Sequence, residues 1–337
     1  MIIRVGIIGF GYWGPNLARN FNSAPDVRLH KIADKNSSRC ALARSNFPQL
    51  EVTTQPDKLI KASDIDLVVI ATPVSTHFEL AMKALENGKH VWIEKPIASS
   101  SQEAIKIADK AQQKNLVVMV DHTYLFTGAV RRIKDVLTEG QLGQLYYYDS
   151  VRVNLGLFQH DVNVMWDLAT HDFSIMNYLL GPTARAVSAA GSCHINELED
   201  IAYVTVFFDN NLVGHLHVNW LSPVKIRKTL IGGSKKMLVW NDLEKEEAVK
   251  IYDKGVAIKT QSGVYDTLAE YRVGDVFSPV VPQTEALKLE VNYLVECIKT
   301  GRKPHNDALT GLQVVKLLEA ADRSLKNNGT QVELSWD

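Results

Sequence analysis

The sequence predicts an α/β plus α+β chain, in which a doubly wound parallel sheet is followed by an open, mostly antiparallel sheet. Three observations predict it. A glycine-rich turn joins the first apolar run to a helical pattern, apolar runs alternate with helical stretches up to about residue 122, and alternating or β-branched runs dominate the second half. We therefore expect two domains, residues 1–122 and residues 123–337.

The glycine-rich turn runs from Gly9 to Gly14 (Gly-Phe-Gly-Tyr-Trp-Gly), between the apolar run Ile2–Ile8 and a helical pattern. This is the G-x-G-x-x-G fingerprint of a dinucleotide-binding Rossmann domain in its strand–turn–helix context. Gly9 permits the tight turn, Gly11 lets the backbone approach a pyrophosphate, and Gly14 lets helix and strand pack closely. The two residues between the second and third glycines, Tyr12 and Trp13, are expected to contact the cofactor as well.

An acidic residue follows the turn at the distance that the fingerprint requires. Asp34 stands twenty residues after Gly14, at the end of the apolar run Val27–Ala33. A carboxylate there accepts hydrogen bonds from the adenosine ribose and repels a 2′-phosphate, so we expect NAD as the cofactor. Arg39 is near enough in sequence to pair with a 2′-phosphate, which leaves NADP open, although an exposed helix residue is the reading that we prefer for Arg39.

Composition and charge exclude several classes of function. With 46% hydrophobic residues, 22% charged residues and a net charge of -1, the chain is typical of a globular protein and has no basic cluster for nucleic acid. Its three cysteines are far apart and fit neither a disulfide framework nor a metal site. No apolar stretch reaches membrane-spanning length and no basic leader precedes the first strand, so we expect a cytoplasmic protein without a membrane partner.

Apolar runs bounded by turn residues give the elements of the first half. The expected strands are Ile2–Ile8, Val27–Ala33, Leu67–Ala71, His90–Ile93 and Leu116–Val120. Helical spacing appears between them, as in Phe78–Leu85, which Asn87-Gly88 ends. The serines at 99–101 with Glu103 predict the N-cap of the next helix.

The second half changes character. Strands are expected at Leu145–Val153, Ala186–Ser192, Ala202–Phe208, Val213–Trp220, Lys228–Ile231 and Lys236–Trp240, with helices at Ala129–Glu139, Val164–Leu180, Glu285–Thr300 and Ala308–Asn327. Asn210-Asn211 predicts a hairpin turn. The segment Tyr252–Pro282 shows no clear pattern.

Polar residues follow the strands at their carboxyl ends, where ligands bind in open α/β sheets. The segment from residue 71 to residue 77 contains Thr72, Pro73 and His77, which we expect to form a wall of the cofactor pocket. For His77 taken alone, we favour a structural role in the first turn of a helix.

Glu94-Lys95-Pro96 follows the strand His90–Ile93. Two charges at this position must emerge in the crevice or be paired, because burying either alone is costly. The Lys95 ammonium would point at a substrate and stabilise negative charge that develops on oxygen when a hydride leaves. Pro96 could follow a cis bond. The alternative is a surface ion pair at the entrance of a loop.

Asp167 and His171 stand four residues apart in a predicted helix and therefore share one face. A carboxylate beside an imidazole orients it and raises its basicity, as a general base near neutral pH requires. The alternative is a polar helix face without a catalytic role. Weaker substrate-binding candidates, each explained equally well by packing, solvent exposure or a sheet edge, are His122, Tyr124, Arg131 and Asn154.

The order of these motifs resembles the Gfo/Idh/MocA family of NAD(P)-dependent oxidoreductases, and the similarity covers most of the chain. The resemblance implies a catalytic group formed by Lys95, Asp167 and His171. It also implies a C-terminal domain that binds the substrate and whose large sheet makes homodimers or homotetramers.

The run Arg152–Gly156 and the segment Thr267–Glu285 resemble family members that act on nucleotide-activated amino sugars. The resemblance implies oxidation at C3 of a UDP-N-acetylhexosamine, which prepares a ketone for an aminotransferase. Members that oxidise the uronic acid form generally carry Asn where this chain has Asp167, which argues against that substrate. A dehydrogenase of a free sugar or polyol (inositol or glucose) and a non-catalytic NAD-binding sensor are the alternatives.

Overall fold

The computed structural model describes residues 2–156, 158–159, 161–259 and 268–336. The chain packs as two compact units, one made of Met1–Phe126 with Thr284–Lys316 and the other of Thr127–Gln283 with Leu317–Asp337. The predicted boundary at residue 122 lies near the end of the first stretch. Residues 284–316 pack in the first unit, whereas the sequence pattern assigns them to the second domain.

The first unit contains a six-stranded sheet in the order β3-β2-β1-β4-β5-β6, in which every neighbouring pair is parallel. The strands are β1 (Ile3–Ile8), β2 (Val27–Ala33), β3 (Glu51–Thr53), β4 (Leu67–Ile70), β5 (His90–Glu94) and β6 (Val118–Asp121). The predicted doubly wound parallel sheet is confirmed. Strand β3 has three residues and no apolar run, so the sequence gives no signal for it.

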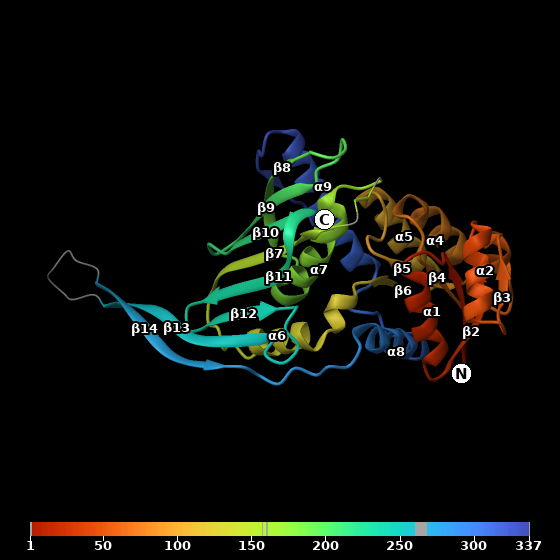
Figure 1. The fold of residues 1–337 in the computed structure, drawn as a ribbon, viewed down its shortest axis with the longest axis horizontal. Helices are drawn as coiled ribbons and strands as arrows, with labels where there is room; N and C mark the ends of the chain where they lie inside the picture. Colours follow the sequence, from red (N-terminus) through yellow and green to blue (C-terminus); the bar gives the residue numbers. More distant parts are fainter. Residues whose placement is uncertain (1, 157, 160, 260–267, 337) are drawn as a thin grey trace. The chain divides into compact units, whose positions relative to one another are not determined.

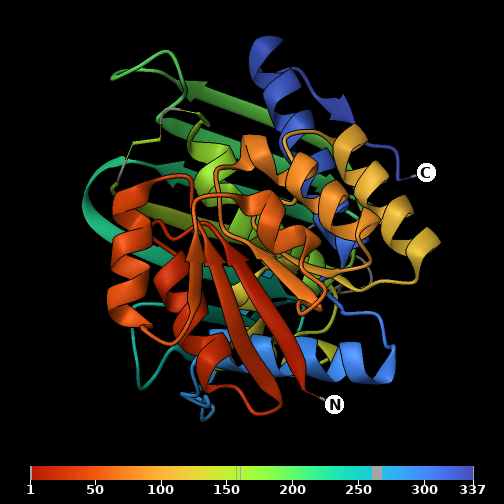
Figure 2. The same cartoon turned by 90° about the vertical axis from the view of Figure 1, so that its right-hand side faces the viewer.

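Helices of the first unit are α1 (Gly14–Ser23), α2 (Ser37–Asn46), α3 (Pro56–Lys61), α4 (His77–Glu86), α5 (Ser101–Lys114), α8 (Ala286–Thr300) and the first half of α9 (Ala308–Lys326). Strand order reverses between β1 and β4, and crossovers in parallel sheets are right-handed. The helices that follow β1 and β2 therefore cover one face and those that follow β4 and β5 cover the other (Figures 1 and 2). The predicted N-cap is confirmed, since the Ser100 hydroxyl accepts the Glu103 N–H.

The second unit contains a nine-stranded sheet in the order β14-β13-β12-β11-β7-β10-β9-β8-β15. Its strands are β7 (Leu145–Leu155), β8 (Ala184–Ser192), β9 (Ile201–Phe208), β10 (Val213–Asn219), β11 (Leu221–Gly233), β12 (Met237–Asn241), β13 (Val249–Lys259), β14 (Leu268–Phe277) and β15 (Val332–Glu333). Among the described strands, β7 and β10 pair in parallel and the other neighbours are antiparallel. The predicted open, mostly antiparallel sheet is confirmed.

Three details of the second unit differ from the sequence pattern. Strand β11 extends well beyond the predicted Lys228–Ile231, and β13 and β14 occupy much of Tyr252–Pro282, where polar residues interrupt the apolar alternation. Residue Thr267, at the start of the second resemblance segment, lies outside the described residues. The inserted helix begins as a π-helical turn, η3 (Met165–Ala169), and continues as α7 (Thr170–Leu180).

Helices α6 (Gly128–Thr138) and α7 pack against each other in this unit. The hairpin turn predicted between β9 and β10 is confirmed, because Asn210 and Asn211 have φ angles of 60° and 58°. Two successive positive φ angles match the right-handed twist of the flanking strands. None of the described helices has the length and apolar character to cross a membrane.

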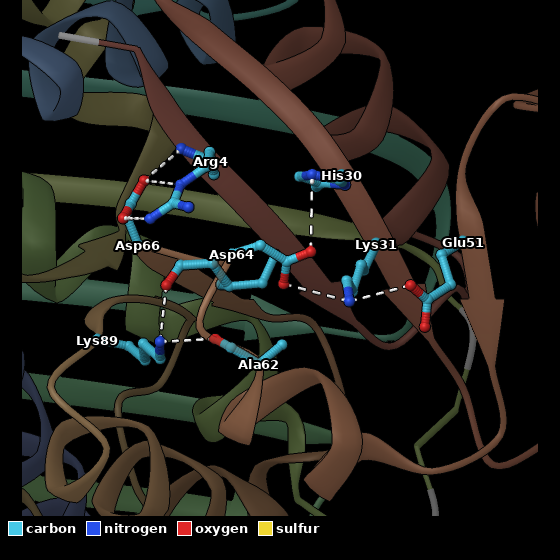
Figure 3. Close-up of polar contacts among 9 residues, drawn as sticks. Arg4, His30, Lys31, Glu51, Ala62, Asp64, Asp66 and Lys89 are labelled. Carbon is cyan, nitrogen blue, oxygen red and sulfur yellow. Dashed lines mark hydrogen bonds and ion pairs between the residues drawn. The ribbon is translucent and has the colours of Figure 1, made fainter.

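A network of ion pairs lies at the amino-terminal ends of the parallel strands (Figure 3). Arg4, at the start of β1, donates to Asp66 through its backbone N–H (2.9 Å), Nε (2.9 Å) and Nη2 (2.6 Å). Lys31 of β2 pairs with both Glu51 and Asp64. The hydrogen bonds from Arg4 hold the pKa of Asp66 below its ordinary value.

Replacing the Asp66 carboxylate should destabilise the first unit in a pH-dependent way. For Asp66→Asn we expect about 1 kcal/mol less unfolding free energy at pH 7, a modest value because the pair is partly exposed. A carboxylate with a depressed folded-state pKa stabilises fully above its ordinary pKa of about 4, and the contribution is lost as pH falls through the folded-state pKa. Urea unfolding of wild type and Asp66→Asn at pH 7 and about pH 3 measures this contribution. A difference in unfolding free energy between the two proteins that grows on acidification would contradict the prediction.

Candidate functional site

The glycine turn lies at the carboxyl end of β1, where two backbone segments approach each other closely. Gly9 has a φ of +99°, and a Cβ there would lie 2.3 Å from the carbonyl oxygen of Ala71. A Cβ on Gly14 would lie 2.4 Å from the Gly9 carbonyl oxygen. Both positions therefore exclude any side chain. Gly14 is the first residue of α1, with a proline in its first turn, so the helix start faces this turn.

Asp34, at the end of β2, holds the turn through a backbone contact. Its Oδ2 accepts the N–H of Phe10 at 2.7 Å and its Oδ1 accepts the N–H of Asn36 at 2.8 Å. The Arg39 guanidinium lies 3.9 Å from Asp34 Oδ2, and its Nη1 would be 3.3 Å from a Cβ on Gly11. Because a carboxylate offers about four lone-pair positions, Asp34 keeps capacity for a ribose.

His77 connects two loops at the carboxyl ends of the parallel strands. It is 1% exposed, and its ring lies between the carbonyl oxygens of Pro96 (Nδ1, 2.9 Å) and Thr72 (Nε2, 2.8 Å). Burial lowers the pKa of His77, and the two carbonyl contacts act in the opposite direction. Thr72 in turn accepts the Thr76 hydroxyl, while Pro73 is exposed. The ring thus fixes the exit of β4 against the Glu94-Lys95-Pro96 turn.

The Glu94-Lys95-Pro96 turn follows β5, and its Lys95–Pro96 peptide bond is cis, as the sequence suggests. Glu94 Oε1 is buried, and burial together with the neighbouring Asp121 raises the pKa of Glu94 well above its ordinary value, while Lys95 acts to lower it. Burial, the charge of Lys95 and His305 lower the pKa of His122 to about 3. Lys95, Glu94 and His122 therefore share one electrostatic environment, in which His122 stays neutral.

The remaining sequence candidates of this unit lie at its surface or in a tight turn. Tyr12 is 86% exposed, and its ring stacks beside that of Trp13. Tyr124 is half-buried in the 3-10 turn η2 (Thr123–Phe126) that follows β6.

Two acidic residues that the sequence reasoning missed lie at the same edge. Asp121, the last residue of β6, is 2% exposed and pairs in register with Glu94. Glu290, on α8, is fully buried, and its pKa is raised well above its ordinary value by burial and by Asp121. A glutamate within the apolar stripe Leu287, Val291 and Leu294 is the signal that could have revealed Glu290.

Asp167 and His171 belong to the second unit. Asp167 lies in the π-helical turn η3 and accepts the Trp220 indole N–H at 3.2 Å, and His171 lies in the first turn of α7. Both side chains are half-buried. Single π-helical turns inside α-helices occur frequently at functional sites.

A buried ion pair anchors the helix next to His171. Asp172 accepts Arg152 Nε at 2.8 Å, Arg152 Nη2 at 3.2 Å and the Ser150 hydroxyl at 2.7 Å. Arg152 and Asp172 are 4% and 1% exposed. Because both partners are charged and buried, removing either would leave an uncompensated charge, so the pair fixes the first turn of α7 on β7.

The two other candidates of this unit differ in their placement. Asn154, near the end of β7, lies close to Gly156, whose Cβ would meet both Asn154 Nδ2 (3.2 Å) and the Trp220 ring (2.6 Å). Asn154 therefore lies near the residue that holds Asp167. Arg131 is exposed on α6, where its charge acts on Tyr178 of α7.

Comparisons with known proteins identify both units. The family model described as "Oxidoreductase family, NAD-binding Rossmann fold" matches residues 3–122, and "GFO/IDH/MocA C-terminal domain" matches residues 130–239. The chain belongs to the Gfo/Idh/MocA family. The family predicted from the motifs is therefore confirmed. The predictions of an NAD-binding Rossmann domain and of an NAD(P)-dependent dehydrogenase are confirmed with it.

The similar proteins act on several kinds of substrate. The chain is 25% identical to scyllo-inositol 2-dehydrogenase (NAD(+)) of Bacillus subtilis, over 98% of this chain and 96% of that one. It is 28% identical to UDP-N-acetylglucosamine 3-dehydrogenase of Acidithiobacillus ferrooxidans, over 93% and 94%. Its fold matches a structure of levoglucosan dehydrogenase with NADH and levoglucosan, with a TM-score of 0.85, 22% identity and full coverage of both chains. These relatives place the chain among NAD-dependent dehydrogenases of sugars and polyols.

The first unit fits NAD on its own geometry. The turn excludes side chains at Gly9 and Gly14, Asp34 stands at the end of β2, and the turn leads directly into the start of α1. The turn and α1 would hold the pyrophosphate and Asp34 the ribose. Within the part of the chain that the structure describes, no group of three or more His, Cys, Asp or Glu could hold a metal ion.

A side chain at Gly11 should block the cofactor without unfolding the chain. For Gly11→Ala, the new Cβ meets only the flexible end of Arg39, so we expect little change in Tm, whereas the dissociation constant for NAD rises about 100-fold because the pyrophosphate cannot approach. Gly255→Ala, in β13 of the second unit, is the matched control, since a Cβ there also meets the end of an arginine side chain, Arg272 Nη2 at 3.1 Å. Calorimetric titration measures both, and wild-type NAD affinity in Gly11→Ala would contradict the assignment.

Proposed function

We propose that this chain is an NAD-dependent dehydrogenase that oxidises a secondary hydroxyl, at C3, of a nucleotide-activated amino sugar such as a UDP-N-acetylhexosamine. The observation that carries the proposal is that both catalytic motifs fall inside matched family domains, Lys95 within residues 3–122 and His171 within residues 130–239. Similarity to a UDP-N-acetylglucosamine 3-dehydrogenase over 93% of the chain supports the substrate class.

In this proposal Lys95, Asp167 and His171 serve one reacting hydroxyl. Bound NAD supplies the hydride acceptor. His171 takes the hydroxyl proton, and the Lys95 ammonium stabilises the negative charge that develops on the oxygen. Asp167, held by the Trp220 indole, stabilises the positive charge that His171 acquires. The ion pair of Arg152 and Asp172 keeps the first turn of α7, and so His171, in place.

A second substrate class has support of its own. The scyllo-inositol 2-dehydrogenase relative matches 98% of this chain, and the substrate in that name is a free polyol. Oxidation of a free polyol or sugar would use the same three residues. A non-catalytic NAD sensor is the third reading, and the presence of Lys95, Asp167 and His171 together argues against it, because a sensor needs no acid–base group.

Loss of the imidazole should remove proton transfer and leave cofactor binding intact. For His171→Ala we expect kcat to fall about 10²- to 10⁴-fold, the usual contribution of a positioned general base, with an unchanged dissociation constant for NAD. His215→Ala, in β10 of the same unit, is the control and should keep the wild-type kcat. Steady-state kinetics and NAD titration give both readouts. A loss of kcat below a few-fold in His171→Ala would remove the assignment.

The substrate class follows from which ligand stabilises the chain in the presence of NADH. We expect UDP-N-acetylglucosamine to raise Tm by several degrees at concentrations where inositols and glucose have no effect, because a ligand that binds only the folded state stabilises it. A thermal shift assay measures this. Stabilisation by an inositol but not by the nucleotide sugar would select the second substrate class instead.

A further inference from the structure

One hydrogen bond joins the glycine turn, which follows β1, to the end of β6, the last strand of the parallel sheet. The indole Nε1 of Trp13, between the second and third glycines, donates to Asp121 Oδ2 at 3.2 Å. Asp121 ends β6, and in the strand order β4 and β5 lie between β6 and β1. The indole N–H is a donor only, so it requires an acceptor at this position.

The Asp121 carboxylate is the common acceptor of its surroundings. Its Oδ1 accepts the Thr123 hydroxyl, and Glu94 and Glu290 both share side-chain hydrogen bonds with it. Burial and the charge of Asp121 raise the pKa of both glutamates well above the ordinary value, which favours the protonated form that can donate to Asp121.

Four donors thus meet the four lone-pair positions that a carboxylate provides. The glutamate on α8 is itself fixed, because Glu290 Oε1 accepts the Asn306 side-chain N–H at 2.9 Å, and Asn306 also donates to the Val120 carbonyl at 2.7 Å. An amide in place of Asp121 would turn one acceptor oxygen into a donor, so the side chain could no longer accept from all four groups.

We propose that Asp121 is a positioning residue for the cofactor: its carboxylate holds the Trp13 indole, and with it the glycine turn, in the conformation that receives the dinucleotide, while it holds Glu94 beside Lys95. The glycine turn and the Glu94-Lys95-Pro96 turn are thereby tied to one buried anion. This inference rests on the proposed function, because it takes NAD to bind at the glycine turn.

Three variants test the proposal by calorimetric titration with NAD. Asp121→Asn should raise the dissociation constant about 10- to 100-fold, the range expected when a hydrogen bond to a charged group is lost. Trp13→Phe keeps an aromatic ring but loses the indole N–H, and should raise the dissociation constant for NAD at least about tenfold. In the double variant the effects should not add, because both changes remove one interaction.

Asp66→Asn is the matched control, since it makes the same substitution in the same unit at the amino-terminal ends of the strands. It should lower Tm and leave the dissociation constant for NAD unchanged, so a general loss of stability cannot imitate the expected result. NAD binding within twofold of wild type in Trp13→Phe would overturn the proposal even if Asp121→Asn failed to fold, and additive effects in the double variant would also overturn it. If the wild-type chain itself bound no NAD, the proposed function would fail first.

Discussion

Parallel pairing brings the carboxyl ends of β1, β2, β4, β5 and β6 to one edge of the first sheet, and the chemistry of this unit is confined to that edge. The constraint is steric as well as topological. The Ala71 carbonyl oxygen after β4 comes so near to Gly9 that no Cβ fits between them. Side chains then hold the loops to one another, because Asp34 accepts from Phe10 and His77 bridges Thr72 and Pro96. These contacts hold the loops of the proposed cofactor site to one another.

Acidic side chains are buried together at the carboxyl-terminal edge of the parallel sheet. Three carboxyl groups, those of Glu94, Asp121 and Glu290, lie together, and three buried negative charges would be costly. Burial and the charge of Asp121 raise the pKa of both glutamates, which favours their protonated, hydrogen-bond-donating form. In the second unit the solution differs, since the Asp172 charge is matched by Arg152 and a hydroxyl. Buried polar groups hold the loops in the first unit and the helix of His171 in the second.

Local patterns predicted much of this protein, and the misses have physical reasons. The glycine turn, Asp34, the parallel strands and the Asn210-Asn211 hairpin each depend on neighbouring residues, so the sequence reveals them. Asp121 and Glu290 depend on contacts between residues far apart in the chain, and β3 is too short to show a pattern. The π-helical turn around Asp167 is a single short turn, so it leaves no signal of its own in the spacing of apolar residues along the sequence. Residues 271–277 of β14 are all exposed, the apolar Tyr271 and Val273 included, so no buried face imposes an alternation there.

The family fixes the reaction class and not the substrate. Relatives named for scyllo-inositol and for UDP-N-acetylglucosamine are about equally similar to this chain, and a shared fold hosts different specificities. In the proposed function Asn154 lies near the Trp220 that holds Asp167, and so near the proposed catalytic group.

A crystal structure of the chain with NAD and its sugar substrate tests the central claim most directly. The account predicts that Lys95 Nζ and a ring nitrogen of His171 both lie within hydrogen-bond distance, about 3 Å, of the same substrate hydroxyl oxygen. If the two side chains lay on separate surfaces with no cavity between them, the account of the catalytic group would be contradicted.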